Sequence, residues 1–110
     1  MRGVVLRFEY GIISHMNATR VFYDKQVLPD DSVIEMVIWQ LPKPEPDRPH
    51  GFKYRLYYGR HGIRLAGYEN ERGKGDHRHR GTKETVYRFL SVEALIADFI
   101  NDVKRMRGES

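Results

Sequence analysis

Residues 52–68 read FKYRLYYGRHGIRLAGY, and this stretch indicates the architecture of the whole chain. Over residues 52–58 the side chains alternate between two faces, as they do in a β-strand with one buried face. Phe52, Tyr54, Leu56 and Tyr58 lie on one face, and Lys53, Arg55 and Tyr57 lie on the other. Residues 59–62 follow as a tight turn, and residues 63–68 return as a second strand with Ile63 and Leu65 on the core side. The stretch therefore predicts an antiparallel β-hairpin.

The residues before this hairpin predict two more strands. Residues 18–25 (ATRVFYDK) are rich in β-branched and aromatic side chains, which favour a strand. After a turn signal in LPDD, residues 32–41 (SVIEMVIWQL) are apolar on both faces, which predicts a central strand covered on both sides. The prolines of residues 42–46 cannot donate to a ladder, so we expect an extended loop that runs to His50.

The residues after the hairpin predict a last short strand and a helix. Residues 86–90 (VYRFL) favour the strand, and Ser91 is a good helix N-cap. Apolar residues then recur at helical spacing: Val92, Leu95, Ile96, Phe99, Ile100, Val103 and Met106. The sequence thus predicts an α+β fold, an antiparallel sheet of four or five strands in meander order with one C-terminal amphipathic helix on one face. The other face needs a cover, which the N-terminal segment, a second copy in a homodimer or a protein partner could supply.

The composition limits the classes of function. The chain has 110 residues and no cysteine, which excludes disulfides, zinc–thiolate sites and thiol catalysis and fits a cytoplasmic protein. No apolar run approaches the roughly 20 residues that span a bilayer, so we expect no membrane partner. The net charge of +4 permits a polyanionic partner without requiring one. We interpret residues 16–110 as a single domain and residues 1–15 as an N-terminal extension, because Met16 would itself be a natural start.

The stretch YENERGKGDHRHRG, residues 68–81, contains no aliphatic side chain and concentrates groups that move protons and hold anions. Histidine as a residue type titrates near neutral pH. In an extended segment, His77 and His79 would point the same way. Asp76 or Glu71 could orient one of these rings, and Lys74 could stabilise a phosphate. These five residues are the predicted catalytic set.

This combination suits RNA cleavage. A base removes the proton of the 2′-hydroxyl, an acid protonates the leaving 5′-oxygen, and cations stabilise the charge on phosphorus. That route needs no metal and no cofactor, and the 2′-hydroxyl makes it specific for RNA. Basic side chains would bind the phosphates, and tyrosines would stack on unpaired bases. The predicted substrate ligands are Arg72, Arg78, Arg55, Tyr54, Tyr68 and Asn70.

Several alternatives stay open on the residues alone. The motif can be a solvated connection in which acids and bases neutralise one another. Asp76, His77, His79 and Glu71 could instead ligate a divalent ion. Glu35 lies among apolar residues, so we expect it to have a partner such as Arg55. His50 and His61 lie in predicted turns, and we expect both to be solvated.

Four segments resemble the TumE family of small toxins, in order and without large gaps over about residues 17 to 107. They are VIEMVIWQLP (33–42), HGFKYRLYYG (50–59), GYENERGKGDHRHRG (67–81) and YRFLSVEALIADFINDV (87–103). The third segment is the most specific, and it departs conservatively from the family at Glu69, where family members commonly have Asp. Residues 1–15 lie outside the family pattern.

The resemblance implies the toxin component of a type II toxin–antitoxin pair. Its partner would be a DNA-binding antitoxin of the helix-turn-helix or winged-helix type that neutralises it. Many unrelated small toxins of such pairs are ribonucleases, which is an analogy and adds to the chemistry of the residues above. Together these observations predict a toxin that inhibits growth by metal-independent RNA cleavage. Two alternatives remain: a non-catalytic toxin or regulatory binding protein that acts on the translation machinery, and a metal-dependent nuclease.

Overall fold

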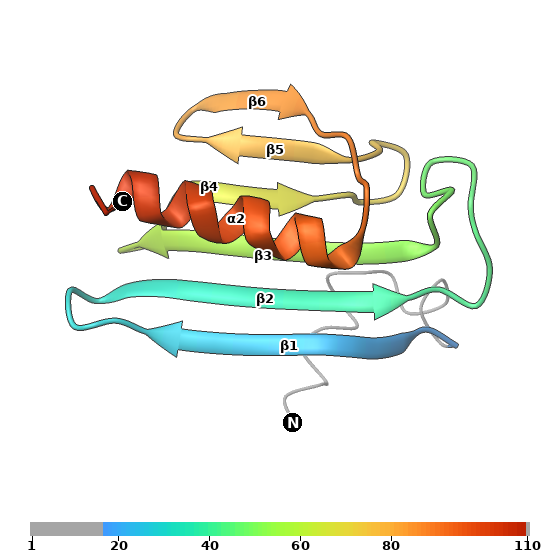
Figure 1. Ribbon diagram of the computed structural model, residues 1–110, viewed down its shortest axis with the longest axis horizontal. Helices are drawn as coiled ribbons and strands as arrows, with labels where there is room; N and C mark the ends of the chain where they lie inside the picture. The colour runs from blue at the N-terminus through green and yellow to red at the C-terminus, as the bar shows by residue number, and fades with distance from the viewer. Residues whose placement is uncertain (1–16, 110) are drawn as a thin grey trace.

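Six antiparallel strands and one helix make up the computed structural model, which describes residues 17–109 (Figure 1). The elements are β1 (Thr19–Val27), β2 (Ser32–Gln40), β3 (Phe52–Arg60), β4 (Ile63–Glu69), β5 (His77–Arg80), β6 (Lys83–Val86) and α2 (Val92–Met106). The strands lie in the order β1-β2-β3-β4-β5-β6, which confirms the predicted meander with one strand more than we expected. The predicted extension, residues 1–15, lies outside the described residues.

The core lies between the sheet and α2, which crosses β3 and β4 (Figure 1). Tyr54, Leu56 and Tyr68 of the sheet pack there against the helix, and Leu95 and Phe99 of α2 are fully buried. Ser91 is the N-cap, and its hydroxyl accepts a hydrogen bond from the Ala94 N–H at 3.0 Å, as predicted. No helix in the described part of the chain is both long enough and apolar enough to cross a membrane.

The prediction for the core face of β4 was wrong for Ile63. Ala66 and Tyr68 are buried and Leu65 packs against the core, whereas Ile63 is 65% exposed. The pairing of β3 with β4 shifts between Tyr58 and Gly59, and a one-residue shift moves side chains to the opposite face. A Cβ at Gly59 would lie 2.6 Å from the backbone carbonyl oxygen of Ile63, so this irregular position requires glycine.

The polar motif that we expected to be a connection contains the additional strand. Residues 77–80 pair with both β4 and β6 and so become part of the sheet. Gly81, with φ +61°, closes the turn into β6, which therefore begins earlier than the predicted strand at residues 86–90. Only Val86 of that predicted strand belongs to β6, because Tyr87 and Phe89 pack against the core instead.

Candidate functional site

Strand β5 sends alternate side chains of the polar motif to opposite faces of the sheet. Arg78 points toward α2, where its guanidinium donates to the Asp102 carboxylate at 2.6 and 2.9 Å. His77 and His79 therefore lie on the other side, which we call the distal face. Their common direction is a direct consequence of the strand that the turn at Gly81 creates.

The two imidazoles belong to one group of charged side chains on the distal face, the histidine cluster: His77, His79, Arg64, Glu69 and Glu84. Nε2 of His79 lies 3.0 Å from Oε2 of Glu69, and Nδ1 of the same ring lies 2.9 Å from Nη2 of Arg64. Oε2 of Glu84 lies 3.2 Å from Nδ1 of His77 and 3.7 Å from Nε2 of His79. One carboxylate oxygen thus contacts both rings.

The pairing of the strands explains how the cluster forms. His79 lies opposite Glu84 of β6 and opposite Gly67 of β4. Because Gly67 has no side chain, Arg64 can lie across this position, where an added Cβ would come 3.1 Å from Arg64 Cδ. The absence of a side chain at Gly67 therefore allows Arg64 to contact His79.

Exposure divides the cluster into inner and outer parts. The side chains of His79 and His77 are 8% and 19% exposed, whereas those of Arg64 and Glu84 are 39% and 42% exposed. Arg64 and Glu84 thus contact the imidazoles with side chains whose ends reach solvent, while Glu69, at 18% exposed, belongs to the inner part. Surface ion pairs of this kind contribute little to stability, roughly 0–1 kcal/mol each, so the outer side chains can exchange these partners for a ligand.

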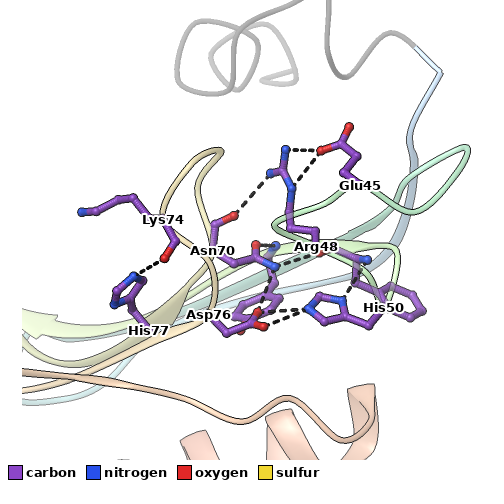
Figure 2. Close-up of polar contacts among 9 residues, drawn as sticks. Glu45, Arg48, His50, Asn70, Lys74, Asp76 and His77 are labelled. Atoms are coloured by element: carbon purple, nitrogen blue, oxygen red, sulfur yellow. Dashed lines mark hydrogen bonds and ion pairs between the residues drawn. The ribbon is translucent and has the colours of Figure 1, made fainter.

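A second group surrounds the carboxylate of Asp76, and we call it the Asp76 hub: Asp76, His50, Tyr54 and Asn70. Figure 2 shows Asp76 with His50 and Asn70. Both oxygens of Asp76 lie close to Nε2 of His50, at 3.0 and 3.1 Å. One of them also accepts from the Tyr54 hydroxyl at 2.6 Å and from the Asn70 amide at 3.1 Å. The hub thus joins the loop before β3 to the loop before β5.

Burial and hydrogen bonding act against each other on the hub carboxylate. Burial would raise the pKa of Asp76, but the hydrogen bonds from His50, Tyr54 and Asn70 outweigh it and hold the pKa below its ordinary value. Burial, together with the bond to Asp76, raises the pKa of Tyr54. Asp76 is therefore an ionised acceptor whose hydrogen-bond donors come from the fold itself.

A comparison with protein families now bears on this geometry. The family model described as "Toxin TumE" matches residues 4–107 of the chain. The chain belongs to the TumE family. The match confirms the resemblance in the sequence, and it starts inside the N-terminal segment that we predicted to precede the family pattern. Searches of curated proteins and of solved structures found no significant match. A toxin family of this kind implies an antitoxin as partner.

The most specific TumE motif splits between the two groups, which corrects one expectation about Asp76. Asp76 orients a histidine, but this histidine is His50 and neither His77 nor His79 (Figure 2). His50 was predicted to be solvated, and it is instead half-buried, with its ring stacked on Phe89 at 3.9 Å between centroids. The long loop between β2 and β3 returns to the motif, a contact that no local pattern indicates.

The predicted base-stacking and amide ligands lie in the interior of this TumE domain. Tyr54, Tyr68 and Asn70 are at most 1% exposed, and all three form hydrogen bonds inside the fold. Their rings and amide leave no surface for an RNA base, so they do not belong to the site proposed below. Arg78 is likewise committed to the buried carboxylate of Asp102, which accounts for the raised pKa of Arg78.

The remaining predicted residues lie at the surface. Glu71, Arg72 and Lys74 are exposed in the loop before β5, and the Lys74 carbonyl accepts from Nε2 of His77 at 2.6 Å (Figure 2). Arg55 is on the distal face with its guanidinium 5.2 Å from the centroid of the Tyr57 ring. Glu35 accepts from the Tyr23 hydroxyl at 3.1 Å, which replaces the partnership with Arg55 that we expected.

Three members of the cluster were missing from the predicted site: Arg64, Glu69 and Glu84. A hairpin with Gly81 and Thr82 as its two-residue turn places Glu84 opposite His79, so the turn was the signal that could have found it. Within residues 17–109, no group of three or more His, Asp or Glu side chains is arranged to hold a metal ion. A cavity of about 270 Å³ lies elsewhere, lined in part by Leu28, Ile34, Ile100 and Val103.

Proposed function

We propose that this TumE toxin cleaves RNA by general acid–base catalysis with His77 and His79. The observation that carries the proposal is the shared contact of both imidazoles with one Glu84 oxygen, at 3.2 and 3.7 Å. The shared contact shows that the two rings lie beside one another, and two neighbouring imidazoles can act on the two ends of one phosphodiester. One takes the 2′-hydroxyl proton, O2′ bonds to phosphorus, the bond from phosphorus to O5′ breaks, and the other protonates O5′. The products are a 2′,3′-cyclic phosphate and a 5′-hydroxyl.

The charged neighbours support the same reaction. Arg64 and Arg55 on the distal face, with Arg72 and Lys74 in the adjoining loop, provide cations for the phosphates on either side of the cleaved bond. Glu69 and Glu84 take the orienting role that the sequence suggested for Asp76 and Glu71. The cellular role that follows is growth arrest in the cytoplasm, relieved by a DNA-binding antitoxin of the helix-turn-helix type.

One observation favours a second function. All four imidazole nitrogens of His77 and His79 have a partner within the protein, as they would in a site that only binds. A toxin that blocks the translation machinery by contact would use the same basic surface without cleaving RNA. Purified protein that stops translation and leaves every RNA intact would establish this alternative.

The deciding experiment compares three asparagine substitutions. His77→Asn and His79→Asn remove a titrating ring, and His61→Asn is the matched control, because His61 lies in a turn at φ +53°, which Asn tolerates. Each variant is expressed in cells, and new RNA ends are mapped. We expect each cluster variant to lose about 10²- to 10⁴-fold in cleavage rate while its melting temperature stays close to that of the wild type.

The effect of EDTA on cleavage also distinguishes the proposed mechanism from a metal-dependent nuclease. Purified wild type should generate 2′,3′-cyclic phosphate ends in the presence of EDTA, and His61→Asn should behave as the wild type does. Loss of cleavage in EDTA, restored by a divalent ion, would instead indicate a metal-dependent nuclease. New RNA ends that persist in both cluster variants would overturn the proposed mechanism.

A further inference from the structure

The two imidazoles of the cluster have different hydrogen-bond surroundings. Nδ1 of His77 faces the Glu84 carboxylate at 3.2 Å, and its Nε2 faces the Lys74 carbonyl at 2.6 Å. Both partners are acceptors, so the ring satisfies both only when each nitrogen carries a proton. His77 is therefore surrounded as an imidazolium would be, which is the form that a general acid needs.

His79 meets one acceptor and one donor. Its Nε2 faces the Glu69 carboxylate at 3.0 Å, whereas its Nδ1 faces Nη2 of Arg64 at 2.9 Å. A guanidinium can only donate, so Nδ1 must be the nitrogen with the lone pair and Nε2 the one with the proton. His79 is thus held as the neutral tautomer, with its basic nitrogen covered by Arg64.

We infer that His79 is the general base through Nδ1, that His77 is the general acid, and that Arg64 covers the base until a substrate phosphate draws it away. This inference rests on the proposed RNA cleavage and assigns a role to each group in it. The Arg64 N–H lies where the 2′-hydroxyl would donate, at an ordinary hydrogen-bond distance from Nδ1. Substrate and Arg64 therefore compete for one lone pair.

The surroundings of Arg64 allow this movement. Its side chain is 39% exposed, and its other contact in the cluster is a 3.7 Å ion pair with Glu69. A phosphate offers two oxygens in the fork geometry that guanidinium prefers, in charge-assisted hydrogen bonds that a neutral imidazole nitrogen cannot match. Arg78 is the contrasting case, because two short bonds hold it to the buried Asp102. Arg64 can therefore leave Nδ1, whereas Arg78 stays in place.

The reaction then follows with every proton assigned. Nδ1 of His79 accepts the 2′-hydroxyl proton as O2′ bonds to phosphorus, and Glu69 stabilises the imidazolium that forms. The bond from phosphorus to O5′ breaks, and His77 gives O5′ a proton from Nδ1, since its Nε2 is held by the Lys74 carbonyl. Glu69 acts through His79 and is a positioning residue, and Arg64 touches the phosphate.

The first test reads the ring nitrogens directly by ¹⁵N NMR in wild type, Arg64→Ala and Arg88→Ala, the last being an exposed arginine outside the cluster. The probe is a dinucleotide that lacks the 2′-hydroxyl and cannot be cleaved. We expect free wild type to carry the His79 proton on Nε2. The probe should move the His79 Nδ1 signal of the wild type toward the position that free Arg64→Ala already shows, because both then lack the Arg64 hydrogen bond, and it should move the signal of Arg64→Ala far less.

The second test measures cleavage of the matching ribodinucleotide. Arg64→Ala should lose about 10²-fold in kcat/KM through the lost phosphate contact, Arg64→Lys should recover part of it, and Arg88→Ala should match the wild type. Glu69→Gln should move the rising limb of the pH–rate profile to lower pH, because the imidazolium loses its anion, and Glu69→Asp should restore it. A merely structural role would not move that limb.

The outcomes distinguish a failure of this inference from a failure of the proposed RNA cleavage. A His79 proton on Nδ1 in the free wild type, or wild-type kinetics in Arg64→Ala, overturns the inference while RNA cleavage by the histidine pair still stands. A wild type that cleaves no RNA overturns the proposed function and the base role of His79 with it. Cleavage with the expected ring signals and an unaltered Arg88→Ala supports both.

Discussion

Two of the carboxylate–histidine pairs among the described residues, Glu69–His79 and Asp76–His50, differ in their surroundings far more than in their geometry. Glu69 meets Nε2 of His79 at 3.0 Å, and Asp76 meets Nε2 of His50 at the same distance. In the hub, the other nitrogen of His50 accepts from the backbone N–H of Phe52, and Asp76 receives two further buried donors. In the cluster, the other nitrogen of His79 meets the exposed Arg64.

The comparison shows what separates a structural histidine from one that can react. Where every hydrogen-bond partner of an imidazole is part of the packed fold, the ring has one arrangement, and a ligand cannot displace any of its partners. Where the partner is the exposed end of a long side chain, a ligand can replace it at little cost in stability. Five substitutions test whether this distinction holds, and their expected effects decrease in the order that follows.

The largest expected change is the loss of the hub carboxylate. Asp76→Ala leaves three donors, on His50, Tyr54 and Asn70, without their acceptor, and we expect the free energy of unfolding to fall by about 3 kcal/mol. Urea denaturation measures this. Glu69→Ala is the matched control in the cluster and should cost less than about 1 kcal/mol. Equal losses at the two positions would break the comparison.

The same carboxylate predicts a dependence on acid. Because the pKa of Asp76 is lower in the folded protein, its contribution to stability is present above the pKa of the unfolded carboxyl and is lost as pH falls through the folded value. Asp76→Asn should therefore show a flatter fall in unfolding free energy below about pH 4 than the wild type does. An unchanged acid limb would contradict the assignment of Asp76 as an ionised acceptor.

A smaller loss of stability is expected from Arg78→Ala. The substitution leaves Asp102, which is 3% exposed, with the Tyr68 hydroxyl as its remaining partner among those described here. We expect the free energy of unfolding to fall by about 2 kcal/mol, because a buried carboxylate loses its counter-charge. Cleavage at a temperature where the variant is folded should stay within a few-fold of wild type. A large loss of activity in fully folded Arg78→Ala would return Arg78 to the substrate site.

A change of about tenfold in cleavage is expected from Glu84→Gln. The amide keeps the shape of the side chain but removes the charge that faces Nδ1 of His77, so the protonated form of this ring loses its support. Stability should change by less than about 0.5 kcal/mol, because Glu84 is exposed on the edge strand β6. Steady-state kcat/KM measures the effect on cleavage, and a thermal melt measures the effect on stability. A loss of stability with unchanged kcat/KM would show that Glu84 is a structural residue.

The smallest expected effect is a slope in alkaline pH. Burial is the main cause that lowers the pKa of Lys53 from 10.5 to about 8. Between these values the unfolded chain holds a proton that the folded chain lacks, so the free energy of unfolding should rise with pH, by at most about 1.4 kcal/mol per pH unit. Denaturation between about pH 8 and 9.5, below the titration of the tyrosines, measures the slope. Lys53→Met should remove it, and a slope that survives would assign it to another group.

Much of the architecture follows from local patterns. The helical spacing of apolar residues, the cap at Ser91 and the strict alternation in residues 52–58 identified α2 and β3, because periodicity and capping depend only on neighbours in the chain. The motif of residues 68–81 identified the family, and the period of two in a strand placed His77 and His79 on one side. Each of these conclusions needs only a short window of sequence.

The partners of those histidines follow from long-range pairing instead. Asp76 and His50 are 26 residues apart, and Arg64 and His79 are 15 apart, so their contacts depend on which way a loop returns and on the register of β4 with β5. The irregular step at Gly59 changes the pairing of β3 with β4, the turn at Gly81 aligns β5 with β6, and a shift of one residue exchanges the two faces of a strand. The sequence therefore identifies the residue types that could do chemistry. The division between the buried hub and the more exposed cluster arises only in the tertiary structure, when distant strands are hydrogen-bonded side by side.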